Sequence, residues 1–99
     1  MFIYNVTVNV EDSIREGWVA WMRTKHIPDV MASGCFSSHR MCKVVSEDPG
    51  ATYAMQYSFN AREDLDRYLK RFAPKLRQEF IERYGDKAPA MRTILEVIE

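Results

Sequence analysis

Apolar and polar residues alternate along three separate stretches of the chain. In the first, apolar side chains occupy every second position, at Phe2, Tyr4, Val6, Val8 and Val10. A period of two is typical of a β-strand that buries one of its faces. The same alternation predicts strands over residues 52–59 and 91–98. The β-forming residues from Cys35 to Val45 predict a further strand.

Two other stretches carry apolar residues at intervals of three and four, which is the spacing of one face of an α-helix. In the first, which begins near Asp12, these residues are Ile14, Trp18, Trp21 and Met22. In the second they form a continuous stripe made of Leu65, Tyr68, Leu69, Phe72, Leu76, Phe80 and Tyr84. Two pairs match the capping box and are expected to start the helices, namely Ser13 with Glu16 and Asn60 with Glu63.

Prolines and glycines predict where these elements end. Pro28 disfavours helical geometry at the residue before it, so the first helix should end or kink near His26, with a short extra turn over residues 28–32. Pro74 should break the second helix around residues 72–73. Gly34 suits a left-handed cap, and Gly85 should end the second helix. Residues 47–50, Glu-Asp-Pro-Gly, predict a turn between two antiparallel strands.

The predicted order is strand, helix, strand, strand, helix, strand, in one domain over residues 1–99. Right-handed crossovers place both helices on one sheet face, which predicts an α+β, ferredoxin-like fold with a four-stranded antiparallel sheet. The opposite face then carries mostly uncharged polar residues, namely Asn5, Thr7, Asn9, Thr52, Gln56 and Ser58. Such a face suits a hydrogen-bonding interface with a second copy, so a homodimer is expected.

Charge and cysteine content exclude several classes of function. The chain has 14 Lys plus Arg and 14 Asp plus Glu, with no basic stripe that would bind nucleic acid. Cys35 and Cys42 should lie on opposite faces of one strand, where they cannot bridge, so we expect a reduced, cytoplasmic protein. The start of the chain is unlike a signal peptide, and no apolar run could cross a membrane. No Cys/His spacing predicts a metal site.

The run Trp18-x-x-Trp21-Met22-x-x-x-His26-x-Pro28, closing at Gly34, resembles the first-helix pattern of the dimeric α/β-barrel superfamily, which includes antibiotic-biosynthesis monooxygenases and EthD-like proteins. The chain as a whole, including its Phe-Ala-Pro at 72–74 and its ending Arg-Thr-Ile-Leu-Glu-Val at 92–97, looks most like a bacterial domain family of unassigned function within it. The resemblance implies a homodimer with a cleft in each subunit between the helices and the sheet. Superfamily members catalyse different reactions, so it implies a fold and no particular chemistry.

His26 is the candidate catalytic residue. In EthD-like relatives a histidine before a proline at the end of the first helix lies near the cleft, and His26 matches it. Its imidazole titrates near neutral pH, as a general base requires. The alternative role is structural, because a histidine near a helix C-terminus can donate to free carbonyl groups. The chain lacks the clustered histidines of haem or metal chemistry, so no cofactor is expected.

Aromatic side chains could line an apolar pocket for a flat aromatic ligand, with phenol groups fixing its orientation. The candidate ligand-binding residues are Trp18, Trp21, Met22, Tyr57, Tyr68, Phe72 and Tyr84. Their alternative role is plain core packing, which a small domain also needs. Arg40, Arg92 and Glu79 interrupt apolar patterns, and such charges are either paired at an interface or aimed at a ligand. If the two arginines face away from the helices, dimer contacts suit them better than binding of a carboxylate. His39 is expected to be exposed.

Two hypotheses of function follow. The first is a small-molecule-binding protein or cofactor-independent enzyme, monooxygenase- or isomerase-like, in which His26 abstracts an acidic proton inside a dry cleft. The second is a non-catalytic homodimeric binding or interaction module whose cleft is filled by its own tryptophans and tyrosines. A cavity on which His26 and a tyrosine converge would favour the first hypothesis, and a solid core the second.

Overall fold

A four-stranded antiparallel sheet forms one layer of the protein. The computed structural model describes residues 1–46 and 52–99, so the turn predicted over 47–50 lies outside the described residues. The strands are β1 (Phe2–Asn9), β2 (Ser38–Lys43), β3 (Thr52–Phe59) and β4 (Ala90–Glu96), in the spatial order β2-β3-β1-β4. This order and the helix connections confirm the predicted α+β, ferredoxin-like fold.

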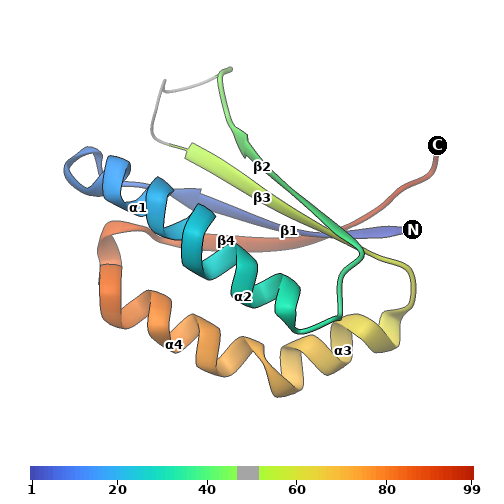
Figure 1. Ribbon diagram of the computed structural model, residues 1–99. Coiled ribbons are helices and arrows are strands. Elements are labelled where there is room, and N and C mark those ends of the chain that lie inside the picture. Colours follow the sequence, from blue (N-terminus) through green and yellow to red (C-terminus); the bar gives the residue numbers. More distant parts are fainter. Residues whose placement is uncertain (47–51) are drawn as a thin grey trace.

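The helices form the second layer, and all of them lie on the same side of the sheet (Figure 1). Between β1 and β2 the chain runs through η1 (Asp12–Ile14), α1 (Arg15–Trp21), the π-helical turn η2 (Met22–His26) and α2 (Ile27–Ala32). Between β3 and β4 it runs through α3 (Arg62–Arg71), α4 (Ala73–Tyr84) and the short η3 (Gly85–Lys87). Both crossovers therefore cover one face and leave the other face of the sheet without helices.

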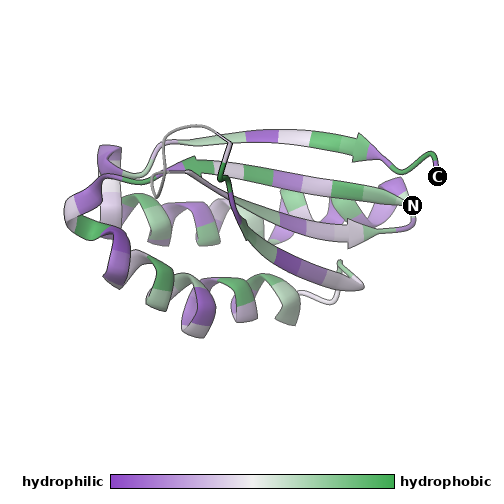
Figure 2. Cartoon of the chain, turned by 90° about the horizontal axis from the view of Figure 1, so that it is seen from above, coloured by the Kyte–Doolittle hydropathy of each residue, from purple (hydrophilic) through white to green (hydrophobic). Residues whose placement is uncertain are grey.

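Strand register decides which side chains face the helices. Tyr4 of β1 lies between Tyr57 of β3 and Ile94 of β4, and all three are on the helix side. Hydrophilic and hydrophobic residues alternate along the strands, as Figure 2 shows. In β3 the helix-side residues are buried, and these are Tyr53, Met55, Tyr57 and Phe59. The apolar strand faces thus pack under the helices as the alternation predicts, and the core lies between the two layers.

Of the two prolines in the helical segments, Pro74 breaks its segment at the predicted place, whereas Pro28 does not end the first one. The backbone stays helical at His26 and Ile27, and the irregularity there is the wide η2 turn just before α2, which carries Pro28 in its first turn. Pro74 lies in the first turn of α4, and the break between α3 and α4 falls at Phe72. Gly34 and Gly85 have φ angles of 74° and 58°, a region that glycine adopts without strain.

Three local predictions are wrong. Neither predicted capping box forms, because Ser13 bonds to Glu11 and the N-cap of α3 is Ala61, which makes no side-chain cap. The second strand is shorter than predicted and begins at Ser38. Cys35 therefore lies before the strand, buried in the core, instead of opposite Cys42 on one strand, although both cysteines are free. In the sequence, the buried residues Cys35 and Phe36 before the strand cannot be told from the strand itself, because β-forming residues continue from one into the other.

Candidate functional site

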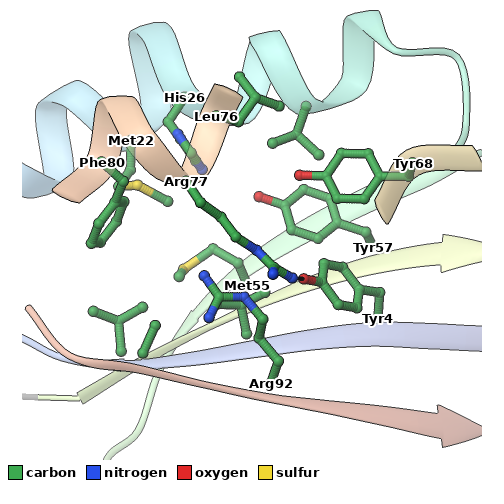
Figure 3. A pocket seen from close by; sticks show the side chains of 14 residues that line it. Tyr4, Met22, His26, Met55, Tyr57, Tyr68, Leu76, Arg77, Phe80 and Arg92 are labelled. Atoms are coloured by element: carbon green, nitrogen blue, oxygen red, sulfur yellow. Dashed lines mark hydrogen bonds between the residues drawn. The ribbon is translucent and has the colours of Figure 1, made fainter. Parts of the chain in front are cut away.

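A cavity of about 30 Å³ lies between the helix layer and the sheet. This volume has room for about one water molecule. Residues of seven elements line it, namely β1, η2, α2, β3, α3, α4 and β4. Figure 3 shows their side chains around the cavity. The side chains that carry polar atoms or rings into it are Tyr4, His26, Tyr57, Tyr68, Arg77, Phe80 and Arg92. The cavity therefore joins residues that are far apart in the sequence.

His26 reaches the cavity from the end of the π-helical turn η2. Such turns widen a helix by one residue and change the direction of the side chains that follow. The His26 ring packs against Trp21, with 5.0 Å between centroids, and against Phe80, at 5.7 Å. Two aromatic rings thus hold the imidazole and shield it from water.

The imidazole of His26 is neutral at pH 7. Burial lowers the pKa of His26 to about 4, and the positive charges of Arg92 and Lys25 add to this effect, while Asp29 opposes it. Its Nδ1 atom is buried and has no hydrogen-bond partner among the described residues. An unpartnered buried nitrogen is costly unless a ligand, water or proton satisfies it. The burial of Nδ1 thus leaves the His26 imidazole with an unmet need for a hydrogen bond.

Three tyrosines form the opposite wall. The ring of Tyr4 lies 6.3 Å from Tyr57 and 5.8 Å from Tyr68, centroid to centroid. Burial is the largest cause of a raised pKa for both Tyr57 and Tyr68, and neighbouring tyrosines contribute to it. These phenols remain protonated at neutral pH, so each of them can donate a hydrogen bond to a ligand oxygen.

Two arginines enter the cavity from different layers. Arg77 of α4 is half-buried, and its Nη2 atom donates a hydrogen bond of 2.9 Å to the Tyr4 hydroxyl. Arg92 of β4 pairs with Val6, which places it on the helix side of the sheet. Neither guanidinium forms an ion pair with a carboxylate of residues 1–46 or 52–99. Lys25 forms ion pairs with two carboxylates, since it bonds to Asp29 and lies 4.0 Å from Glu79.

The structure brings four of the predicted site residues to the cavity, namely Met22, His26, Tyr57 and Tyr68. The other four lie elsewhere. Trp18 is fully buried against Tyr53, at 5.2 Å between centroids. Phe72 packs on the far side of Tyr68, and Trp21 and Tyr84 form an aromatic layer around Phe80. These four support the site or the core without lining the cavity, which agrees with the core-packing alternative for them.

Ten of the wall residues were not among the predicted site residues, and four of these ten carry rings or charges, namely Tyr4, Arg77, Phe80 and Arg92. The signal for Arg77 is a charged residue directly after Leu76 of the apolar stripe. Arg92 and Arg40 share one prediction, either pairing at an interface or contact with a ligand. They lie on opposite faces, because Arg40 pairs with Gln56 on the open side of the sheet. His39 is exposed, as expected.

The donor set argues for an organic ligand. Within the described parts of the chain, no three His, Cys, Asp or Glu residues come together in a way that would hold a metal ion. The cavity combines one neutral imidazole, phenol donors and two cationic groups with apolar walls made by Met22, Met55 and Leu76. This cavity suits a small molecule that has an apolar body and a polar or anionic group.

None of the helices in the described residues is long and apolar enough to span a membrane.

Comparison with known proteins gives one family and a common fold. A family profile with the description "Domain of unknown function (DUF4286)" matches residues 1–98. The chain is similar to a dimeric ferredoxin-like protein from an uncultured marine organism, with a TM-score of 0.78 and 12% identity over 99% of this chain and 95% of that chain. No curated protein matches the sequence.

Two further solved structures share this architecture. One is an ethyl tert-butyl ether D (EthD) family protein from Bacillus halodurans, with a TM-score of 0.71 and 12% identity over 99% of this chain and 100% of that chain. The other is SnoaB, a cofactor-independent oxygenase from Streptomyces nogalater, with a TM-score of 0.72 and 8% identity over 99% and 93% of the two chains. At such identities the likeness establishes the fold. This fold is the one that the first-helix resemblance implied.

Proposed function

The chain belongs to the family described as Domain of unknown function (DUF4286), and we propose that it is a cofactor-independent enzyme acting on a small aromatic compound. His26 would be the general base, and the cavity between helices and sheet would be the active site. The observation that carries this proposal is a buried, neutral imidazole with an unpartnered Nδ1 atom that lines the same cavity as the protonated phenols of Tyr57 and Tyr68. A base and hydrogen-bond donors on opposite walls are what proton abstraction next to a carbonyl needs.

The proposed step transfers one proton. Nδ1 of His26 takes a proton from a C–H or O–H group that an adjacent carbonyl makes acidic, and the bonding electron pair stays on the substrate as an enolate or phenolate. Hydrogen bonds from Tyr57 and Tyr68 stabilise the oxygen that gains the charge. The negative charge beside His26 in turn stabilises the imidazolium, which offsets the lowering of its pKa by burial. Return of the proton to another atom would give isomerisation, and reaction of the anion with dioxygen would give oxygenation.

Substrate entry requires side chains to move. A benzene ring needs a cavity of about 150 Å³, several times the volume of this one. Arg77 and Phe80 are half-buried and Arg92 is exposed, so these three can rotate outward at small cost. The buried tyrosines and Met22 form the fixed part of the site. We therefore expect ligand binding to enlarge the cavity on the side of α4 and β4.

The test begins with thermal-shift screening of aromatic acids and quinones, followed by an exchange assay on each compound that binds. The assay measures by NMR the exchange of the acidic substrate proton for solvent deuterium. His26→Gln should slow this exchange by a factor of about 100 or more. His39→Gln removes an exposed histidine from β2 and should leave the rate unchanged. Equal rates in the two variants would rule out His26 as the base.

A binding protein without catalysis is the second candidate function. The small volume of the cavity favours it, because the tyrosines and Arg77 already fill most of the space between the layers. It predicts compounds that raise the melting temperature but show no accelerated proton exchange and no turnover. The exchange assay therefore separates the two candidates.

We also propose that the protein is a homodimer in which two copies meet through the open face of the sheet. On that face, Leu95 pairs with Ile3 and Met91 pairs with Thr7. Met91 and Leu95 are 68% and 41% exposed, which is high for large apolar side chains on a sheet. The solved relatives described as dimeric ferredoxin-like proteins support this arrangement. A second copy on this face would remove that apolar surface from water.

Light scattering coupled to size-exclusion chromatography tests the dimer. Leu95→Arg places a charge in the proposed interface and should convert the dimer to a monomer at micromolar concentration. Ile81→Arg is the matched control, because Ile81 is 58% exposed on α4, away from that face. A monomeric wild-type chain, or dissociation by both variants alike, would contradict the proposed interface.

A further inference from the structure

We propose that Arg77 and Arg92 form an anion subsite that selects aromatic carboxylates as ligands of the cavity. This inference rests on the proposed function only in that the cavity takes a small molecule, and it holds for catalytic and non-catalytic binding alike. It adds the chemical class of the ligand and the residues that recognise it. Neither arginine was among the site residues expected from the sequence.

The two guanidinium groups approach one region from opposite layers of the fold. Arg77 extends from α4 and Arg92 from β4, and in Figure 3 their charged ends point toward the same part of the cavity. The hydroxyl of Tyr4 lies beside them, at 2.9 Å from Nη2 of Arg77. Tyr4 pairs with Ile94 across the sheet, so it lies one inward-facing position along from Arg92. A ligand oxygen held here could contact both arginines and the phenol.

The charge around this region is not balanced by the described residues. Two guanidiniums near one cavity repel each other, and no carboxylate of the described residues pairs with either of them. Asp29, the acid that acts on His26, is engaged by Lys25, which also lies 4.0 Å from Glu79. The positive charge of Arg92 is strong enough at the cavity to lower the pKa of His26. A bound anion would relieve this repulsion, whereas a bound cation would increase it.

The geometry favours a carboxylate on an apolar body. A planar carboxylate accepts two parallel hydrogen bonds from one guanidinium, which suits Arg77 once it leaves Tyr4. A free phosphate or sulfate has no apolar body that could contact the apolar part of the wall. The rest of the wall is apolar or aromatic, with Met22, Met55 and Phe80 next to the charged end. An aromatic ring can pack there while its carboxylate stays with the arginines.

Calorimetric titration with benzoate and benzamide tests the inference, because these compounds share size and shape and differ in charge. Wild-type protein should bind benzoate about ten-fold more tightly than benzamide. Arg77→Met should weaken benzoate binding about ten-fold. Arg92→Met should weaken it about three-fold, because Arg92 is more exposed to solvent. Arg40→Met, which removes the same type of side chain from the open face of the sheet, should change nothing.

Further variants keep the test decisive. If Arg77→Met unfolds, Arg77→Lys retains the charge but loses the two-pronged geometry, and it should bind benzoate less tightly with little change for benzamide. His26→Gln should preserve the preference for benzoate, even if it abolishes proton exchange, so failure of the proposed base is distinguishable from failure of the anion subsite. Equal affinity for the two compounds, or no binding of either up to about 10 mM, overturns the inference.

Discussion

Arg77 and Tyr4, which are 73 residues apart in the sequence, are joined by a hydrogen bond of 2.9 Å from Nη2 to the phenol oxygen. The bond connects α4 to the central strand β1 across the cavity. It is a polar contact within a wall that is otherwise apolar and aromatic. It holds the half-buried arginine over the cavity.

Tyr4→Phe should lower the free energy of unfolding by about 1 kcal/mol, because it removes one hydrogen bond to a charged donor and leaves the ring in place. Tyr57→Phe is the matched control, since the Tyr57 hydroxyl forms no hydrogen bond with another described residue, and a change within about 0.5 kcal/mol is expected. Urea denaturation of both variants measures the difference. Equal losses would show that the bond to Arg77 adds nothing to stability.

Acid should destabilise the protein partly through His26. The pKa of His26 is about 4 in the folded chain and about 6.5 in the unfolded chain. Above pH 6.5 the imidazole is neutral in both states. As the pH falls from 6.5 to 4, only the unfolded chain binds the proton, so the free energy of unfolding decreases, by roughly 3 kcal/mol in total.

His26→Gln should remove this component of the pH dependence, whereas His39→Gln should retain it. Urea denaturation between pH 4 and 7 provides the measurement, with the wild-type chain as reference. A wild-type curve that coincides with that of His26→Gln over this range would mean that the folded chain does not lower the pKa of His26.

Trp21→Ala should raise the pKa of His26 toward its ordinary value. Burial is the main cause of the low pKa, and the Trp21 ring lies 5.0 Å from the imidazole, so its removal lets water reach the ring. Phe72→Leu is the control, because Phe72 packs on Tyr68 and makes no ring contact with His26. NMR titration of the His26 ring protons reports the pKa, and a value unchanged by Trp21→Ala would exclude shielding by this ring.

Two glycine substitutions should change stability in opposite directions. Gly17 lies inside α1 with nothing within 4 Å of an added Cβ, so Gly17→Ala should stabilise the protein by about 0.5–1 kcal/mol. Gly85 ends α4 with φ of 58° and ψ of −131°, where a side chain is strained, so Gly85→Ala should destabilise it by about 1–3 kcal/mol. Thermal denaturation of both variants gives the signs, and a stabilising Gly85→Ala would contradict the strained geometry.

Sequence alone predicted the elements whose pattern is local. Alternation in β1 and β3 and the apolar stripe through α3 and α4 report burial on one face, and that face is the one covered in the structure. Pro74 acts on the turn next to it, so the break between α3 and α4 was predictable, whereas packing keeps Ile27 helical in front of Pro28. The capping boxes failed because a cap depends on how the chain enters the helix, which the spacing of two residues does not determine.

The strand β4 shows where the pattern stops being informative. As an edge strand it leaves every residue from Met91 to Glu96 exposed in one chain, so its alternation does not reveal which face turns inward. Pairing with β1 decides this, by placing Arg92 beside Val6 on the helix side. Arg40 sits on the opposite face for the same kind of reason, through its pairing with Gln56.

The sequence by itself determined the order of strands and helices, their amphipathic faces, and His26 as the candidate base. Only the tertiary structure decided which side chains meet that histidine. The periodicity of a segment indicates which of its residues are buried, and this depends on that segment alone. Contact with the cavity depends on strand register and on packing between four elements, and it brings together Tyr4, Tyr68, Arg77 and Arg92. Those distances arise when the two layers assemble, and no local pattern encodes them.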